Sequence, residues 1–265
     1  MPSVIVPSHW VRGAWVLPET KLNLRLFCFA HSGGGASLYR DWARAFGEAG
    51  IEVCPVQLPG REERLRETPF DRLETLVPEL AVNLRPYLYQ PFAFFGHSLG
   101  ALVAFELAAY LENELGAGQT ARTLFVSGCR APRLNYNENP IHHLPQSGFI
   151  NQIVRRYGGL PDGILAHPEL LNIFIPAMRA DFTLLENYDY RRDHPTDYRL
   201  HCPILALGGQ DDPAVTDAEL ELWQSHTTRS FDYRLFEGGH FFIKNSFNRV
   251  KQYLLESLDP ALTQA

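Results

Sequence analysis

The chain alternates between short apolar runs and longer segments whose apolar residues recur at helical spacing. Glycine, proline or polar turns bound the short runs, and continuous apolar strands are typical of a parallel sheet that is buried on both faces. The predicted strands cover residues 24–30, 51–57, 92–95, 123–127, 203–208 and 232–236. The predicted helices cover residues 38–49, 72–87, 101–115, 217–225 and 242–258. This alternation predicts an α/β fold with a mostly parallel, doubly wound sheet.

One segment interrupts the alternation of strands and helices. No strand is predicted between residues 131 and 198, where helical patterns run over 147–157 and 169–187 with a glycine-rich link at 158–163. An ordinary helical crossover is the alternative, but the segment is longer than one crossover helix requires. We therefore expect a single domain over residues 1–265 with a helical lid insertion, here called the lid segment (131–198). The residues after 258 are expected to fray.

Composition and charge exclude some classes of protein. The chain has 265 residues, 45% of them hydrophobic, and can therefore bury a complete core. Its net charge of -6 argues against a general nucleic-acid binder, which needs a basic face. The run 91–111 has the hydropathy of a membrane span, but a glycine-flanked serine within it favours a buried strand and helix. Residues 1–15 lack the pattern of a signal peptide.

The cysteines are expected to be reduced thiols. Cys28, Cys54 and Cys129 lie in or beside strand-like runs, and Cys202 precedes one. None of them has the spacing of a metal site or of a redox pair. We interpret them as mostly buried thiols of a cytoplasmic protein, for which no metal and no cofactor are expected.

The pentapeptide 96–100, Gly-His-Ser-Leu-Gly, carries the main chemical signal. It joins a predicted strand to a predicted helix, and a serine between two glycines at such a junction is the arrangement of a nucleophile elbow. The tight turn lifts the hydroxyl of Ser98 above the sheet and directs the N-terminus of the next helix toward it. A glycine-rich structural turn is the alternative, because this pentapeptide also occurs by chance.

A serine nucleophile needs a base and a group that orients the base. His240 follows the last predicted strand and is the candidate base, with a surface histidine as the alternative. Asp212 follows the strand before it and is the candidate acid; the adjacent Asp211 competes with it, and either could be a turn-forming aspartate. The chain order Ser98, Asp212, His240 is that of α/β-hydrolases. All three follow the carboxyl ends of strands, where open α/β sheets place their sites.

Negative charge that develops on a carbonyl oxygen needs fixed backbone N–H donors. Leu99, directly after the nucleophile, is expected to supply one. The glycine-rich loop after the first predicted strand is expected to supply the second, which we assign to the amide of Ser32. A phosphate-binding loop is the alternative, but no Gly-Lys-Ser/Thr sequence follows. The neighbouring His31 and His97 are interpreted as structural loop residues.

Together these motifs resemble those of type II thioesterases, the stand-alone hydrolases that accompany polyketide synthases and nonribosomal peptide synthetases. The resemblance covers about residues 22–258 and includes segments 27–36, 57–62, 94–101, 179–182, the Asp212 loop and 238–241. Its most family-specific part is Leu-Pro-Gly-Arg-Glu at 58–62. One departure is Ala-His-Ser at 30–32, where the family more often has a proline and an alanine. It falls at the expected oxyanion donor.

The resemblance implies an α/β-hydrolase fold and the hydrolysis of acyl thioesters on the phosphopantetheine arm of acyl or peptidyl carrier proteins. Such enzymes remove stalled or misloaded acyl groups in polyketide or nonribosomal peptide biosynthesis. A medium-chain acyl-carrier-protein hydrolase of fatty acid synthesis and a small-molecule carboxylesterase are the main alternatives. An acyltransferase and a non-catalytic binding protein of the same fold are less favoured. Neither a nucleic acid nor a membrane is expected as a partner.

Two groups of residues have weaker functional interpretations. Apolar residues of the lid segment either line an acyl site or form the core of the lid: Phe149, Ile150, Ile164, Leu165, Phe174, Ile175 and Phe182. Basic residues either meet an acidic carrier protein or form a solvated surface: Arg61, Arg64, Arg155 and Arg156.

Overall fold

The computed structural model describes residues 9–12, 22–115, 120–134, 136, 139–158, 168–194 and 197–262. Within these residues six parallel strands form one sheet in the order β2-β1-β3-β4-β5-β6. Their bounds are β1 Leu24–Phe29, β2 Ile51–Pro55, β3 Phe92–His97, β4 Leu124–Ser127, β5 Ile204–Gly209 and β6 Phe231–Phe236. Every predicted strand is present, with ends shifted by a residue or two, and the predicted α/β class is confirmed.

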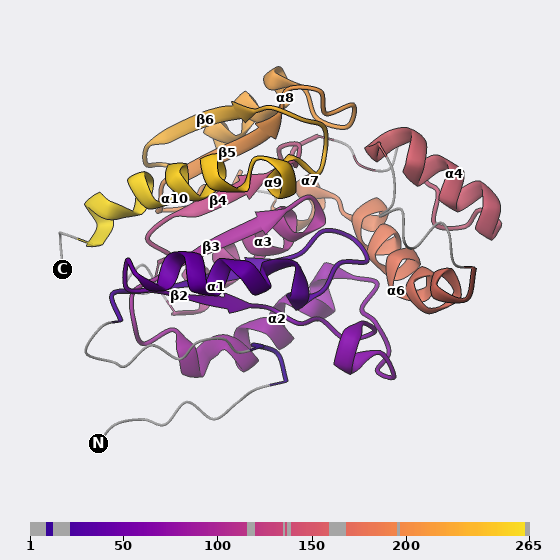
Figure 1. Cartoon of the computed structure of the whole chain (residues 1–265), viewed down its shortest axis with the longest axis horizontal. Helices are drawn as coiled ribbons and strands as arrows, with labels where there is room; N and C mark the ends of the chain where they lie inside the picture. The colour runs from indigo at the N-terminus through magenta and orange to yellow at the C-terminus, as the bar shows by residue number, and fades with distance from the viewer. Residues whose placement is uncertain are drawn as a thin grey trace.

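Helices cover both faces of the sheet (Figure 1). The principal ones are α1 Arg40–Gly47, α2 Leu73–Leu84, α3 Leu99–Leu115 and α10 Phe247–Leu262. On one face α1 and α10 share a core in which the rings of Trp42 and Phe95 lie 4.8 Å apart. On the other face α2 and α3 pack in a second core that contains Phe94 and Leu102. Because both faces are covered, β1 to β5 are buried along almost all of their length, whereas the edge strand β6 is only partly buried.

The strand order reverses beside β1. The chain passes from β1 outward to β2 and then returns to place β3 on the other side of β1. The loops that follow β1 and β3 therefore diverge at this point, which is where open α/β sheets bind their ligands. Ser32 lies on the first of these loops and Ser98 on the second. The topology thus brings the predicted oxyanion loop to the predicted nucleophile.

The lid segment lies beside the carboxyl ends of the strands, where Figure 1 shows its two longer helices next to each other. Its helices are α4 Gln146–Tyr157, α6 Pro168–Asn187 and α7 Tyr190–Asp193. The segment has its own small core, in which Phe149 and Ile153 of α4 are buried with Met178 and Phe182 of α6. Most of the predicted link 158–163 lies outside the described residues.

The last predicted helix, 242–258, is divided into α9 Phe242–Asn245 and α10. Ser246 lies at the break, where its hydroxyl donates to the carbonyl oxygen of Glu237 at 3.0 Å. The helix continues to Leu262, four residues beyond its predicted end at 258. In three other predicted helices a 3-10 turn forms one end: Ala36–Tyr39 before α1, Arg85–Tyr87 after α2 and Leu222–His226 after α8 Asp217–Glu221.

The apolar run 91–111 forms β3 and most of α3. Among the described residues, none of the helices combines the length and apolar character that a membrane span requires. The four cysteines are buried free thiols, in agreement with the sequence interpretation. Burial raises the pKa of each thiol above its ordinary value.

Candidate active site

Ser98 lies in the tight turn between β3 and α3. Its backbone φ of 55° falls in the left-handed region, which few residues other than glycine adopt. Its N–H donates to the carbonyl oxygen of Ser127 on β4 at 2.7 Å, and its own carbonyl oxygen accepts from the N–H of Ala101 at 2.9 Å. The sheet and the first turn of α3 therefore hold this strained backbone in place.

Close backbone contacts require the two glycines of the elbow. A Cβ atom at Gly96 would lie 2.2 Å from the carbonyl oxygen of Gly100. A Cβ atom at Gly100 would lie 2.2 Å from the carbonyl oxygen of Phe29 on β1. Both obstacles are backbone atoms, which no side-chain rotation can move away. The structure thus has the elbow geometry that the pentapeptide predicts, with α3 starting directly above β1 and β3.

His240 connects Ser98 to Asp212. Its Nε2 lies 3.0 Å from the Oγ of Ser98, and its Nδ1 lies 2.8 Å from the Oδ2 of Asp212. The three residues follow β3, β5 and β6 and come together at the carboxyl edge of the sheet. The side chains of His240 and Asp212 are 2% and 0% exposed, so water does not weaken the hydrogen bond between them.

Asp212, rather than the adjacent Asp211, faces His240. The second carboxylate oxygen of Asp212 accepts from the N–H of Ala214 at 2.9 Å, so both oxygens have partners and the carboxylate is held in one orientation. Asp211 is exposed, and its N–H donates to the carbonyl oxygen of Gly238 at 3.0 Å. That bond joins the loop after β5 to the loop that carries His240.

The two predicted oxyanion donors lie on the two loops that meet at the elbow. Leu99 is the first residue of α3, so its N–H is one of the donors that have no partner inside the helix. In the loop after β1, the N–H of Gly34 donates to the carbonyl oxygen of His31 at 2.8 Å. This bond closes a turn with Ser32 at its second position. The role of the Ser32 amide stays a prediction.

A cavity of about 240 Å³ opens onto Ser98 and His240. Its walls come from the loop after β4, the Asp212 loop and the lid segment. Among the described apolar residues that the sequence singled out, Phe149 and Phe182 both belong to the core of the lid segment, and Phe182 also lines the cavity. Ile164 and Leu165 lie outside the described residues.

Cys129 lines the same cavity as Ser98. Burial raises the pKa of its thiol to about 11, so the thiolate that would act as a nucleophile is scarce at neutral pH. The hydroxyl of Ser98, in contrast, lies against an imidazole. Of these two groups, Ser98 is therefore the one equipped for attack on a carbonyl carbon.

Two further imidazoles lie beside His240. The ring of His97 lies 5.3 Å from that of His240, and the ring of His31 lies 6.1 Å from that of His97. Burial lowers the pKa of His97 well below its ordinary value and that of His31 to about 4. Both are neutral at pH 7, so neither places a fixed positive charge against a protonated His240. His97 is the last residue of β3 rather than a loop residue, because the strand runs two residues further than predicted.

Tyr157 belongs to the site although no motif pointed to it. It is the last residue of α4, and its ring lies 5.0 Å from that of His240 and 5.8 Å from that of Phe182. Tyr157 thus covers one side of His240 from the lid segment. A single aromatic residue at the end of a helix has no sequence signal that would distinguish it from a core residue.

Two of the four arginines that were expected either to meet a carrier protein or to form a solvated surface are buried, so for Arg61 and Arg64 both interpretations are wrong. Arg61 forms an ion pair with Asp181, and Arg64 donates from Nη1 to the carbonyl oxygen of Gln57 at 2.9 Å. Internal partners take up both guanidinium groups, which therefore present little charge to a partner protein. Arg155 is exposed and Arg156 is half-buried.

Comparisons with known proteins place the chain in a family. A family model described as "Thioesterase domain" matches residues 24–258. The linear gramicidin dehydrogenase LgrE of Brevibacillus parabrevis is 41% identical, over 97% of this chain and 95% of its own. The type II thioesterase BorB from the borrelidin biosynthetic cluster is 34% identical, with a TM-score of 0.83 over 94% of this chain and 97% of its own.

A second solved structure agrees with this placement. RedJ, a thioesterase from the prodiginine biosynthetic pathway of Streptomyces coelicolor, is 37% identical, with a TM-score of 0.80 over 89% of this chain and 90% of its own. The name of LgrE describes a dehydrogenase, whereas the family model and both solved structures are described as thioesterases. The parallel sheet, the serine elbow and the matching family model agree, and the chain belongs to the thioesterase family with an α/β-hydrolase fold.

Proposed function

We propose that this thioesterase hydrolyses acyl groups from the phosphopantetheine arm of acyl or peptidyl carrier proteins in the cytoplasm. In this role it edits stalled or misloaded intermediates of polyketide or nonribosomal peptide biosynthesis. The observation that carries the proposal is the hydrogen-bonded series Ser98, His240 and Asp212 at a cavity beside the lid segment. Similarity to enzymes from the borrelidin and prodiginine pathways supports the biosynthetic context.

Acylation of the enzyme is the first half of the proposed reaction. The Oγ of Ser98 attacks the thioester carbonyl carbon while its proton moves to the Nε2 of His240, and Asp212 stabilises the resulting imidazolium. The amides of Leu99 and Ser32 donate to the oxyanion, and loss of one such donor typically costs about 10²–10³ in rate. When the C–S bond breaks, His240 returns the proton to the departing thiolate. The acyl group is left as an ester on Ser98.

Deacylation uses the same groups in the same places. The Nε2 of His240 removes a proton from a water molecule, whose oxygen attacks the ester carbonyl carbon. The same N–H donors hold the second oxyanion. Collapse of this intermediate breaks the bond to Ser98, which regains its proton from His240, and the free carboxylic acid departs. These residues suffice for the proposed reaction without a metal or a cofactor.

In this proposal the lid segment (131–198) is the cover of the acyl chamber within a single domain. The rings of Tyr157 and Phe182 support this assignment, because both line the cavity and that of Tyr157 lies 5.0 Å from the ring of His240. A cover that limits the access of water strengthens the hydrogen bonds beneath it. The exposed Arg155 on α4 is a candidate contact for an acidic carrier protein.

Intact-mass measurement of an acyl-loaded carrier protein tests the proposal. Wild-type enzyme is expected to restore the free phosphopantetheine thiol, and Ser98→Ala is expected to act at least about 10³-fold more slowly. Ser257→Ala on α10, far from the cavity, is the matched control and should keep the wild-type rate. Retention of full activity by Ser98→Ala contradicts the assignment of the nucleophile.

Two substrate series separate the alternatives. Faster hydrolysis of free p-nitrophenyl esters than of the same acyl group on a carrier protein favours a carboxylesterase. A steep preference for chains of about eight to twelve carbons on the carrier favours a medium-chain acyl-carrier-protein hydrolase. An editing enzyme is expected to accept short and varied acyl groups on a carrier instead.

A further inference from the structure

Arg61 and Asp181 form a buried, bidentate ion pair. Arg61 lies in the loop after β2, and Asp181 lies on α6 of the lid segment. The guanidinium donates from Nη1 to Oδ2 and from Nη2 to Oδ1 of the carboxylate, both at 2.9 Å. The two side chains are 4% and 2% exposed. Two parallel hydrogen bonds fix the plane of each group as well as its position.

Asp181 also holds the loop after β1. Its Oδ2 accepts a hydrogen bond from the N–H of Gly33, the residue after Ser32, at 2.7 Å. The Nη1 of Arg61 lies 3.4 Å from the carbonyl oxygen of Gly34, the next residue along. The ion pair therefore contacts both residues that follow Ser32 in the turn.

Steric contact fixes the spacing between α6 and the same loop. Gly33 has a φ of 75°, and a Cβ atom on it would lie 2.3 Å from the Cγ of Met178. Met178 and Asp181 are three residues apart and so lie on the same side of α6. The helix thus packs against the loop through a methionine and bonds it through a carboxylate. Movement of the loop relative to α6 breaks at least one of these contacts.

We propose that Asp181, held by Arg61, is a positioning residue that fixes the peptide after Ser32 and so directs the Ser32 N–H at the oxyanion. The inference rests on the proposed function and on the amide of Ser32 as the second donor. Oxyanion donors are effective when they are held at about 2.7–3.1 Å from the position that the oxygen will occupy. Because Asp181 belongs to the lid segment, displacement of α6 removes this support. The packing of α6 against the loop after β1 and the correct placement of the Ser32 N–H then depend on each other.

Stability alone does not call for charges at this place. Replacement of a buried ion pair by apolar residues of similar volume is often neutral or stabilising. The adjoining core of the lid segment is apolar and includes Met178 and Phe182, so an apolar pair would continue it. A carboxylate is needed because it accepts the N–H of Gly33, and the arginine is needed because its two parallel hydrogen bonds hold that carboxylate in one orientation.

Asp181→Asn tests the positioning role. The amide keeps the shape of the side chain but turns one acceptor into a donor that faces Arg61. Hydrolysis of butyryl-N-acetylcysteamine is measured together with inhibition by n-butylboronic acid, whose tetrahedral adduct on Ser98 places an oxygen at the oxyanion position. We expect kcat and the affinity for the boronic acid to fall together by about 10- to 100-fold, while KM stays within about threefold.

Glu74→Gln is the matched control. Glu74 pairs with Arg192 near the far end of the lid segment, so its loss also removes an ion pair between that segment and the rest of the molecule. It lies outside the cavity, and both kcat and boronic acid affinity are expected to stay within about twofold of the wild type. A fall equal to that of Asp181→Asn would overturn the inference, because any loosening of the lid segment would then be enough.

The double variant Arg61→Met/Asp181→Leu separates positioning from stability. It leaves no unpaired buried charge, so its thermal unfolding midpoint is expected within a few degrees of the wild type. Its kcat and its affinity for n-butylboronic acid are nevertheless expected to stay at least about tenfold low. Wild-type values of both in either variant would overturn the positioning role. Full activity of Ser98→Ala would instead overturn the proposed function, so the two failures are distinguishable.

Discussion

Two ion pairs of opposite character tie the lid segment to the rest of the molecule. The inner pair, Arg61 with Asp181, has side chains that are 4% and 2% exposed. The outer pair, Arg192 of α7 with Glu74 of α2, has side chains that are 51% and 49% exposed. Water and salt screen the outer charges but scarcely reach the inner ones. An ion pair therefore holds side chains in a fixed orientation at the inner end of the lid segment, whereas at the outer end it contributes little to stability.

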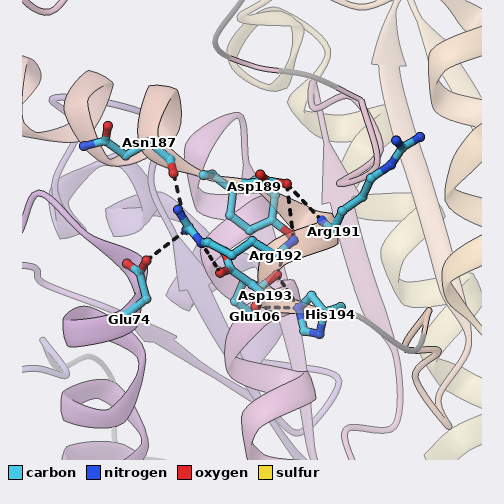
Figure 2. A network of polar contacts seen from close by, with 9 residues as sticks. Glu74, Glu106, Asn187, Asp189, Arg191, Arg192, Asp193 and His194 are labelled. Carbon is cyan, nitrogen blue, oxygen red and sulfur yellow. Dashed lines mark hydrogen bonds and ion pairs between the residues drawn. The ribbon is translucent and has the colours of Figure 1, made fainter.

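Figure 2 shows what surrounds the outer pair. The guanidinium of Arg192 is shared between Glu74 and Asp193, at 2.9 and 2.7 Å. Beneath it the carboxylate of Glu106 on α3 lies 3.0 Å from the Nε2 of His194. That carboxylate also accepts from the hydroxyl of Tyr188 at 2.6 Å. The outer end is thus held by a half-buried network with an ion pair at its surface, whereas at the inner end the ion pair is itself the buried contact.

Removal of one inner charge is expected to have the largest effect on stability. Arg61→Ala leaves the carboxylate of Asp181 buried without its partner, so the free energy of unfolding should fall by about 3–5 kcal/mol. Urea unfolding followed by tryptophan fluorescence measures this loss. Arg155→Ala, an exposed arginine of the lid segment, is the control and should cost less than about 0.5 kcal/mol. A loss below about 1 kcal/mol for Arg61→Ala would remove the distinction between the two pairs.

Acid is expected to weaken both ends of the lid segment, because a neutral histidine with a lowered pKa lies beside each: the half-buried His31 and the buried His226. Burial lowers the pKa of His31, in the inner turn, to about 4 and that of His226, whose ring lies 4.9 Å from that of Tyr190 in α7, to about 3. Below about pH 6.5 these histidines are protonated in the unfolded chain but stay neutral in the folded chain. Each histidine therefore lowers the free energy of unfolding by about 1.4 kcal/mol per pH unit between pH 6.5 and 4, and contributes nothing above pH 6.5.

Urea unfolding at pH 7, 6 and 5 checks this dependence. His31→Asn removes one group that takes up a proton on unfolding. The free energy of unfolding should therefore fall by about 1.4 kcal/mol less per pH unit below pH 6.5 than in the wild type, whatever the substitution does to stability at pH 7. His143→Asn removes an exposed histidine of the lid segment and should leave the slope unchanged. Equal slopes for the wild type and His31→Asn would show that His31 is protonated as readily in the folded chain as in the unfolded one.

Removal of the outer ion pair is expected to have the smallest effect. Arg192→Ala should lower the free energy of unfolding by about 0–1 kcal/mol at low salt, and this difference should vanish in about 1 M NaCl. The loss at Arg61→Ala should persist in the same salt. A loss above about 2 kcal/mol at Arg192, or one that salt does not reduce, would contradict the contrast between the two ends.

The strands and the site residues Ser98, Asp212 and His240 were accessible from sequence because each leaves a local signal. A parallel strand buried on both faces is apolar along its length, and the residues that follow its carboxyl end stand out as polar or glycine-rich. The elbow also leaves a signal in the sequence, because close backbone contacts restrict both Gly96 and Gly100 to glycine, and the two glycines flank Ser98 in the chain. Such signals need no knowledge of distant contacts.

The inner ion pair could not be found in this way. Arg61 and Asp181 are 120 residues apart, and an arginine followed by two glutamates has the pattern of a solvated surface. Nothing local shows that α6, which lies between β4 and β5 in the chain, packs against Arg61 and buries it. The ring of Tyr157 over His240 escaped detection for the same reason, because its position depends on how the lid segment folds back.

The hydrogen bond from the N–H of Gly33 to Asp181 limits how the lid segment could be exchanged between relatives by recombination. Three stretches that are distant in the gene meet there: the loop after β1, the loop after β2 and one turn of α6. Crossover points at the two ends of the lid segment would separate these three stretches. They would combine α6 of one relative with the loops after β1 and β2 of another. A productive chimera must keep a carboxylate in register with both the glycine and the arginine, so the smallest exchangeable part of this enzyme is discontinuous.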